Sequence, residues 1–155
     1  MWAKAGYVYA VSRLCRSASA PRPLHVILYA NRYVGENGEG FRPPTPPEKR
    51  IEAYYALAGG ASALSFWWYT PGKPAQGLGA PDAEMQVLSI EVGLIAAEMR
   101  TAGPLISRAA PIELPVKTTP RIWTRTLAAG LDSLLLVVVN DDYVNDRQGT
   151  VIKPA

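Results

Sequence analysis

Aromatic side chains gather at one point of the sequence, at the end of the run ASALSFWWY (residues 61–69). Alternation along a strand places Trp67 and Tyr69 on one face and Trp68 on the other. The flat apolar face of an indole ring matches the C–H face of a pyranose, and the ring N–H can bond a hydroxyl group. Trp67 is therefore predicted to stack on a sugar ring. The alternative interpretation is a pair of core tryptophans packed under helices.

Other residue clusters give only weak evidence for metal or cofactor chemistry. Asparagine and aspartate side chains within residues 140–146 offer the oxygen ligands that calcium prefers, but their spacing does not match an EF-hand loop. A polar turn is therefore favoured there. The glycines within residues 35–40 resemble a dinucleotide loop, yet no helix begins directly after them. With one cysteine, Cys15, and one histidine, His25, no zinc constellation is possible. The sequence predicts no metal site and no cofactor.

Composition places the chain among ordinary globular proteins. It has 155 residues, of which 48% are hydrophobic and 19% charged, and its formal net charge is +3. The basic residues are scattered, with no Lys/Arg run longer than two, which argues against nucleic acid as the main partner. No apolar stretch approaches the roughly 18 residues of a membrane span. We therefore expect no nucleic-acid partner and no membrane partner.

Periodicity and turn residues predict the elements in the order helix, strand, helix, strand, long helix and then strands. A run such as LHVILYA, rich in β-formers and apolar throughout, is typical of a strand buried on both faces. Expected helices cover residues 2–19, 45–58 and 82–102, and expected strands cover residues 24–30, 61–69, 122–127, 133–140 and 150–153.

The second of these helices has the clearest local signal. Thr45-Pro46-Pro47-Glu48 is a capping box with proline at the first helical position. Gly59 and Gly60 are expected to end the helix. At the end of the long helix, Gly103-Pro104 is expected to stop it in the same way.

The strand–helix–strand order over residues 24–69 requires a parallel sheet. Two parallel strands expose their backbone edges and need cover on both apolar faces. The strands that follow residue 109 show a hairpin-type pattern, with few strands for a sandwich. Two incomplete architectures in one chain suggest a fragment or a chain that needs partners.

The stretch RPPTPPEKRIEAYYALAGGASALSFWWY (residues 42–69) resembles the last βα units of glycoside-hydrolase-type (β/α)8 barrels. In that group a strand and a long loop precede a Pro-Thr-x-x-Glu-x-Arg helix start. This helix is Ala-rich. It is followed by Gly-Ala and then by a strand with aromatic residues at its end. Bacterial members often continue through a long helix into a C-terminal β-sandwich. The resemblance covers roughly residues 20–140.

The resemblance implies a fold class of α/β followed by all-β, namely a partial (β/α)8 TIM-type barrel plus a partial β-sandwich. Residues 1–108 would be the C-terminal portion of the barrel and residues 109–155 the start of the sandwich. Residues 24–30 and 61–69 would be barrel strands seven and eight. The first six strands would be missing.

Barrel active sites lie at the carboxyl ends of the strands, and glycoside hydrolysis normally uses two carboxyl groups. The strand that would supply the first carboxylate is absent, and no acid lies in residues 24–32, where the second is expected. The acids nearest to that position are Glu36 and Glu39, which are the candidate catalytic residues. Ordinary solvated loop residues are the alternative interpretation. The candidate substrate-binding residues are Trp67, Tyr69, Asn31, Arg32 and Tyr33.

Three functions remain open at this point. The first is a glycoside-hydrolase-like protein that hydrolyses O-glycosidic bonds in its full-length form. A non-catalytic carbohydrate-binding accessory module is the second, and a truncated barrel fragment without independent activity is the third. The expected partners are carbohydrate, together with a second copy of the chain or a missing N-terminal barrel portion. An extracytoplasmic location is compatible with the full-length protein.

Overall fold

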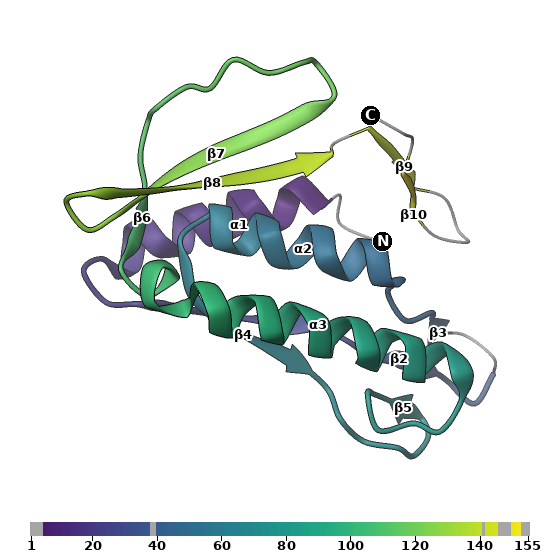
Figure 1. Ribbon diagram of the computed structural model, residues 1–155. Helices are drawn as coiled ribbons and strands as arrows, with labels where there is room; N and C mark the ends of the chain where they lie inside the picture. The colour runs from purple at the N-terminus through teal and green to yellow at the C-terminus, as the bar shows by residue number, and fades with distance from the viewer. Residues whose placement is uncertain (1–4, 38–39, 141, 146–149, 153–155) are drawn as a thin grey trace.

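The computed structural model describes residues 5–37, 40–140, 142–145 and 150–152. Within them the helices are α1 (Ala5–Ser19), α2 (Pro46–Ala58) and α3 (Ala83–Ile106). The strands are β1 (Leu24–Tyr29), β2 (Arg32–Val34), β3 (Gly40–Phe41), β4 (Ala61–Trp67), β5 (Ala75–Gln76), β6 (Ala109–Pro111), β7 (Ile122–Ala129), β8 (Ser133–Asn140), β9 (Tyr143–Asn145) and β10 (Thr150–Ile152). Figure 1 shows α1 and α2 lying between the β7–β8 sheet and the strand β4.

Helix α2 forms where its sequence predicts it. The Thr45 side chain accepts a hydrogen bond from the Glu48 N–H, and the Glu48 carboxylate accepts one from the Thr45 N–H at 2.7 Å. The predicted capping box is therefore confirmed. At the other end Gly60 has a φ of +99°, a conformation that glycine adopts without steric cost. This conformation lets β4 begin directly after the helix.

Strands β1 and β4 form a parallel pair joined through α2. The sheet that they form has two strands among the described residues. One of its faces is apolar and packs against α2 and α3. The residues buried in this packing are Leu28, Ala53, Ala56, Ala61 and Ile95.

A second sheet has the order β6-β7-β8 and is antiparallel throughout. Gly130, with a φ of +80°, lies in the turn between β7 and β8. Trp123 of β7 packs edge-on against Tyr55 of α2 and Tyr9 of α1, at ring-centre distances of 4.8 and 4.9 Å. Leu127, Val137 and Val139 are buried in the same core. Helix α2 therefore contributes to the cores under both sheets.

The long helix α3 differs from its prediction at the C-terminal end. It begins as expected, because the Asp82 side chain accepts a hydrogen bond from the Met85 N–H. It does not stop at Gly103-Pro104 but continues to Ile106. A proline inside a helix loses one backbone donor, and this loss matters less in the last turn, where little helix remains to be distorted.

The predicted partial barrel with a partial sandwich is wrong. The described residues form a small mixed α/β domain, with helices and sheets of two or three strands, and they contain neither a closed barrel nor a sandwich. The local strand–helix–strand unit does form, but barrel closure needs further strands to pair with its edges. The apolar face of the β6-β7-β8 sheet is buried against helices, and no second sheet from the described residues covers that face.

Candidate functional site

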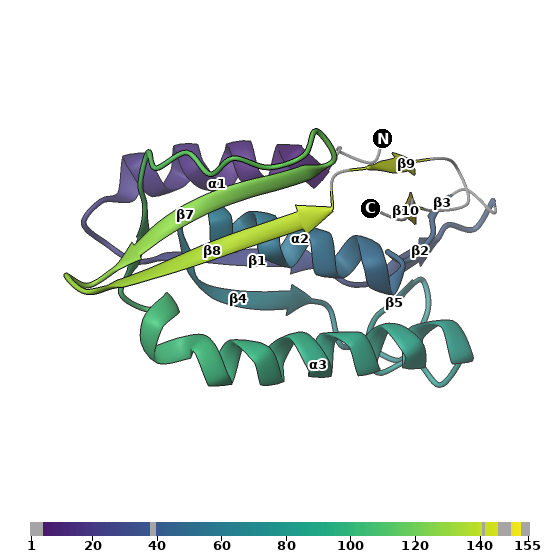
Figure 2. The same ribbon diagram turned by 45° about the horizontal axis from the view of Figure 1, so that its top comes forward.

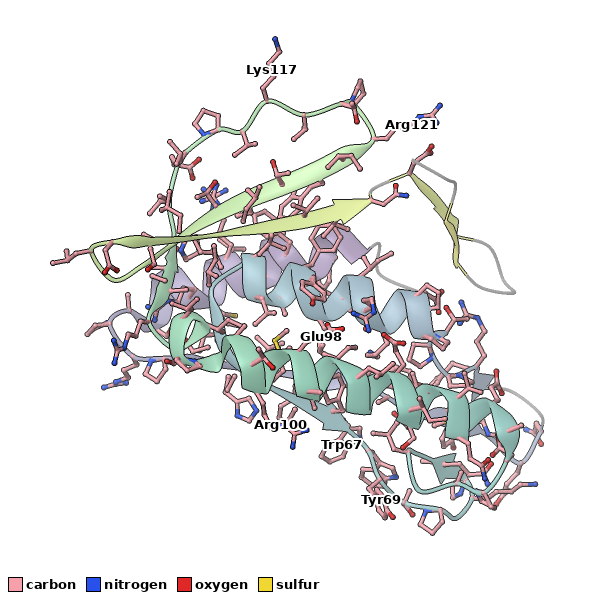
Figure 3. The ribbon with its side chains drawn as sticks, in the orientation of Figure 1. Trp67, Tyr69, Glu98, Arg100, Lys117 and Arg121 are labelled. Atoms are coloured by element: carbon pink, nitrogen blue, oxygen red, sulfur yellow. The ribbon has the colours of Figure 1, made fainter. Side chains whose placement is uncertain are left out.

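One face of the β1–β4 pair is not covered by the helices. Ile27 is 60% exposed on this face and Trp67 is 52% exposed. His25 Nε2 lies 2.7 Å from Ser65 Oγ, which joins the two strands across the same face. Figure 3 shows Trp67 and Tyr69 on the side of the molecule away from the β7–β8 sheet. The candidate sugar-stacking ring is therefore open to solvent.

A short loop holds these aromatic residues in place. Backbone N–H groups of residues 77–79 donate to the carbonyls of residues 68–70 at 2.7 to 2.8 Å. A Cβ at Gly77 would lie 1.9 Å from the Trp68 carbonyl oxygen, so only glycine allows this approach. The Trp68 Nε1–H donates to the Ala75 carbonyl at 3.0 Å, which fixes the half-buried ring. Tyr69, by contrast, is 76% exposed.

More aromatic side chains lie at the carboxyl end of β1. Tyr29 pairs in register with Trp67. The Phe41 ring contacts Tyr29 edge-on at 5.1 Å between ring centres, and it lies 5.7 Å from the Tyr33 ring. Phe41 is 43% and Tyr33 is 40% exposed. We call these four residues, Trp67, Tyr29, Phe41 and Tyr33, the aromatic row.

A hollow of about 930 Å³ lies beside the aromatic row, between the β2–β3 hairpin and the loop before β5. Tyr33 and Phe41 supply its aromatic wall, and Glu36, Asn37 and Lys73 supply its polar groups. The residues that line it are Tyr33, Gly35, Glu36, Asn37, Gly40, Phe41, Lys73 and Pro74. The hollow thus combines flat apolar rings with an acid, an amide and an amine.

The structure describes one of the two candidate catalytic acids. Glu36 is exposed and lines the hollow. Glu39 lies outside the described residues. Among the carboxylates of the described residues, only that of Glu36 lines the hollow.

Two further predicted contact residues, Asn31 and Arg32, have different surroundings. Arg32 donates to Gln76 Oε1 and forms an ion pair with Asp82 at 2.7 Å. These bonds connect β2 to the loop and to the start of α3, so Arg32 positions the hairpin. Asn31 is 5% exposed, and its Oδ1 accepts no hydrogen bond from the residues that the structure describes. An unsatisfied amide oxygen is rare in a protein interior and is an open position for a donor.

Behind the carboxyl end of β1 lies a set of charged residues that sequence reasoning missed. The fully buried Lys49 forms an ion pair with Glu52, and Arg42 forms one with Glu48 at 2.6 Å. Burial lowers the pKa of the Lys49 ammonium, while burial raises the pKa of the nearby Tyr29 hydroxyl. Because the Lys49 side chain has no access to solvent, we assign it a structural role. Its position after the capping motif gave no signal of burial.

The hollow also contains residues outside the predicted catalytic and substrate-binding set, namely Asn37, Phe41 and Lys73. Phe41 stands in a glycine-rich loop, and its approach to Tyr29 depends on the pairing of β2 with β3. Among the described side chains, no group of three or more His, Cys, Asp or Glu could hold a metal ion. None of the helices in the part searched is long and apolar enough to cross a bilayer.

No protein-family model, curated protein or solved structure matches this chain. The resemblance to glycoside-hydrolase-type barrels is therefore corrected on two grounds. No solved barrel of that kind matches, and the described residues form a small mixed α/β domain with no closed barrel. The motif over residues 42–69 is a helix cap, a helix and a strand with aromatic residues at its end. Such a local pattern arises wherever a helix leads into a strand of this composition.

Proposed function

We propose that the chain binds carbohydrate on the aromatic row at the carboxyl ends of β1 and β4. The observation that carries this proposal is the exposure of Trp67, which is 52% exposed on the uncovered face of the sheet. An indole ring in that position leaves apolar area in water. Stacking on the C–H face of a sugar would remove that area from water.

The surroundings of the aromatic row favour a sugar over a purely apolar ligand. Sugars present apolar C–H faces and many hydroxyl groups, so a site for them needs flat rings and hydrogen-bonding groups together. Phe41 and Tyr33 lie at the hollow with Glu36, Asn37 and Lys73. A carboxylate accepts hydrogen bonds from hydroxyl groups, an ammonium donates them, and an amide does both. Ligand sites in general combine an apolar lining with a few polar groups that fix orientation.

The proposed activity is binding and not hydrolysis. Hydrolysis of a glycosidic bond normally uses two carboxyl groups roughly 5 to 10 Å apart. Among the described residues that line the hollow, only Glu36 supplies one. A non-catalytic carbohydrate-binding module is therefore the function that the arrangement of side chains supports best.

Tryptophan fluorescence of the purified chain, titrated with a panel of neutral oligosaccharides, tests this proposal. Trp67 is exposed, so a stacked sugar should change its emission in a saturable way. The wild-type chain and the Trp67→Ala variant are titrated in parallel, and circular dichroism checks that both are folded. A saturable change that is lost in the variant supports the proposal. A folded chain that responds to no sugar class, or responds equally without Trp67, contradicts it.

A further inference from the structure

A second cleft, of about 790 Å³, runs between strand β8 and helices α2 and α3. Residues 135–140 of β8 all line it. Successive side chains of a strand point to opposite faces. A cleft that reaches every residue from 135 to 140 therefore follows the edge of the strand and does not lie over one face only.

This edge of β8 has no strand beside it in the described part of the chain. The sheet order is β6-β7-β8, so β7 occupies one side of β8 and the cleft lies on the other. Figure 2 shows β8 on the side of the sheet nearer to α3, with β7 beyond it. The N–H and C=O groups along a strand edge form a template for another strand.

The walls of the cleft are apolar on both sides. Met99, Ala102 and Ile106 of α3 form the wall opposite β8, and Ile51 and Leu57 of α2 lie at its base. A strand paired with β8 directs alternate side chains to the sheet face that the helices cover, so these side chains need to be apolar. A small apolar molecule would fill this volume, but it would offer no hydrogen-bond partner to the backbone groups along the β8 edge.

The cleft also carries an acidic group that the sequence did not reveal. The Arg50 guanidinium donates from Nε to Glu91 at 2.5 Å and from one terminal nitrogen to both Glu98 oxygens at 2.8 Å. The Tyr54 hydroxyl donates to Glu98 at 2.6 Å. Burial, followed by the hydrogen bond to Glu98, raises the pKa of Tyr54 to about 12, so the hydroxyl is neutral at pH 7.

Two carboxylates and one guanidinium give this group a net charge of −1. Glu98 uses both oxygens in these bonds, whereas Glu91 uses Oε1 and its Oε2 accepts no hydrogen bond from the described residues. Figure 2 shows α3 and β8 running in opposite directions. Glu91, in the first half of α3, therefore lies toward the Asn140 end of β8. A positive charge on the occupant would complement this end of the cleft.

We propose that the cleft takes an extended peptide strand of a partner protein, which pairs with the edge of β8. Its alternate apolar side chains point at α3, and one basic residue lies beside Glu91. In this mode of recognition the main-chain hydrogen bonds provide affinity, and the pockets for alternate side chains provide specificity.

The experiment uses a fluorescein-labelled peptide of about the length of β8, which has 8 residues. The peptide alternates valine with threonine and carries one lysine, and fluorescence anisotropy measures its binding to the full chain. Two further peptides carry N-methyl groups on one or the other alternate set of amides. Strand pairing uses only one set, so we expect one methylated peptide to bind about tenfold or more weakly and the other to bind nearly normally.

Two protein variants on α3 provide a matched pair. Ala102 lines the cleft, whereas Ala97 is exposed on the same helix and does not line it. Ala102→Trp should fill the cleft and abolish binding, while Ala97→Trp should leave it unchanged. Glu91→Gln should reduce the preference for the lysine peptide over its glutamate analogue. Equal binding of the two methylated peptides, or no saturable binding at all, would overturn the proposal even if Ala102→Trp fails to fold.

Discussion

Tyr29 and Trp67 pair in register across the parallel strands β1 and β4, at the end of the sheet where both strands finish. Alternation places both residues on the face that carries His25 and Ser65, which are joined at 2.7 Å. The Phe41 ring then continues this aromatic surface from Tyr29 toward the hollow. These rings come from separate parts of the sequence. The parallel pairing of β1 and β4 places Tyr29 beside Trp67, and the pairing of β2 with β3 positions Phe41.

Trp67 and Trp68 provide the first prediction, because adjacent tryptophans differ in exposure and bonding. Trp67 is 52% exposed, whereas Trp68 is half-buried and donates to the Ala75 carbonyl. Trp67→Ala should weaken sugar binding by about tenfold or more without loss of folding. Trp68→Ala should instead lower the free energy of unfolding. Titration calorimetry and urea unfolding of both variants check this, and equal loss of binding in both would reverse the assignment.

The helix cap provides a second prediction. Thr45→Ala removes the side chain that accepts the Glu48 N–H, so the free energy of unfolding should fall by about 1 kcal/mol. Urea denaturation followed by circular dichroism measures the change. Thr119→Ala, in the exposed loop before β7, is the control and should have no effect. An unchanged urea midpoint for Thr45→Ala would show that the capping box does not stabilise α2.

Two glycines with positive φ form a matched pair for a third prediction. A Cβ at Gly60 would lie 2.8 Å from Arg16 Cγ, whereas at Gly130 the nearest atom of another described residue beyond its chain neighbours would be Asp132 Oδ1, at 3.9 Å. Gly130→Ala should cost about 1 kcal/mol of backbone strain. Gly60→Ala should cost about 2 to 3 kcal/mol, because a side-chain clash is added to the strain. Thermal unfolding compares them, and equal costs would show that the contact with Arg16 relaxes freely.

The raised pKa of Tyr54 predicts how stability depends on alkaline pH. Burial and the hydrogen bond to Glu98 raise this pKa to about 12 in the folded chain, above the ordinary value near 10. The folded state therefore favours the protonated hydroxyl. This contribution is fully present below pH 10 and is lost as the pH rises toward 12.

In Tyr54→Phe the free energy of unfolding should accordingly fall less steeply between pH 10 and about 12 than in the wild-type chain. Urea midpoints at a series of pH values measure this. Tyr7→Phe is the control, because Tyr7 is 60% exposed and should leave the slope unchanged. The same slope in Tyr54→Phe and the wild-type chain would contradict the assignment.

The uncovered face of the β1–β4 pair predicts self-association. Ile27 is 60% exposed there, and the described residues provide no further strand for either edge of the pair. Sedimentation velocity should show a concentration-dependent increase in mass. Ile27→Lys should reduce it, because a charge at the interface must be desolvated. A single monomeric boundary at every concentration would contradict the prediction.

The sequence by itself determined the local elements. The cap at Thr45 set the start of α2, and the run from Ser133 to Asn140 gave a strand with the expected bounds. These features depend on neighbours within a few residues, and caps, periods and turns record such neighbours directly. Alternation placed Trp67 and Trp68 on opposite faces, but this placement is wrong, because β4 ends at Trp67 and the two ring centres lie 4.6 Å apart. The short strands β2, β3 and β5 were not predicted, since two or three residues leave no measurable period.

Tertiary structure decided which surfaces remain open and which charges meet. The barrel expectation failed because a local strand–helix–strand pattern does not specify how many strands follow or what covers them. The Phe41 ring contacts the Tyr29 ring, and Glu98 accepts a hydrogen bond from Arg50, because elements far apart in sequence pack together. Burial and pairing of this kind depend on long-range packing, and no local pattern carries that information.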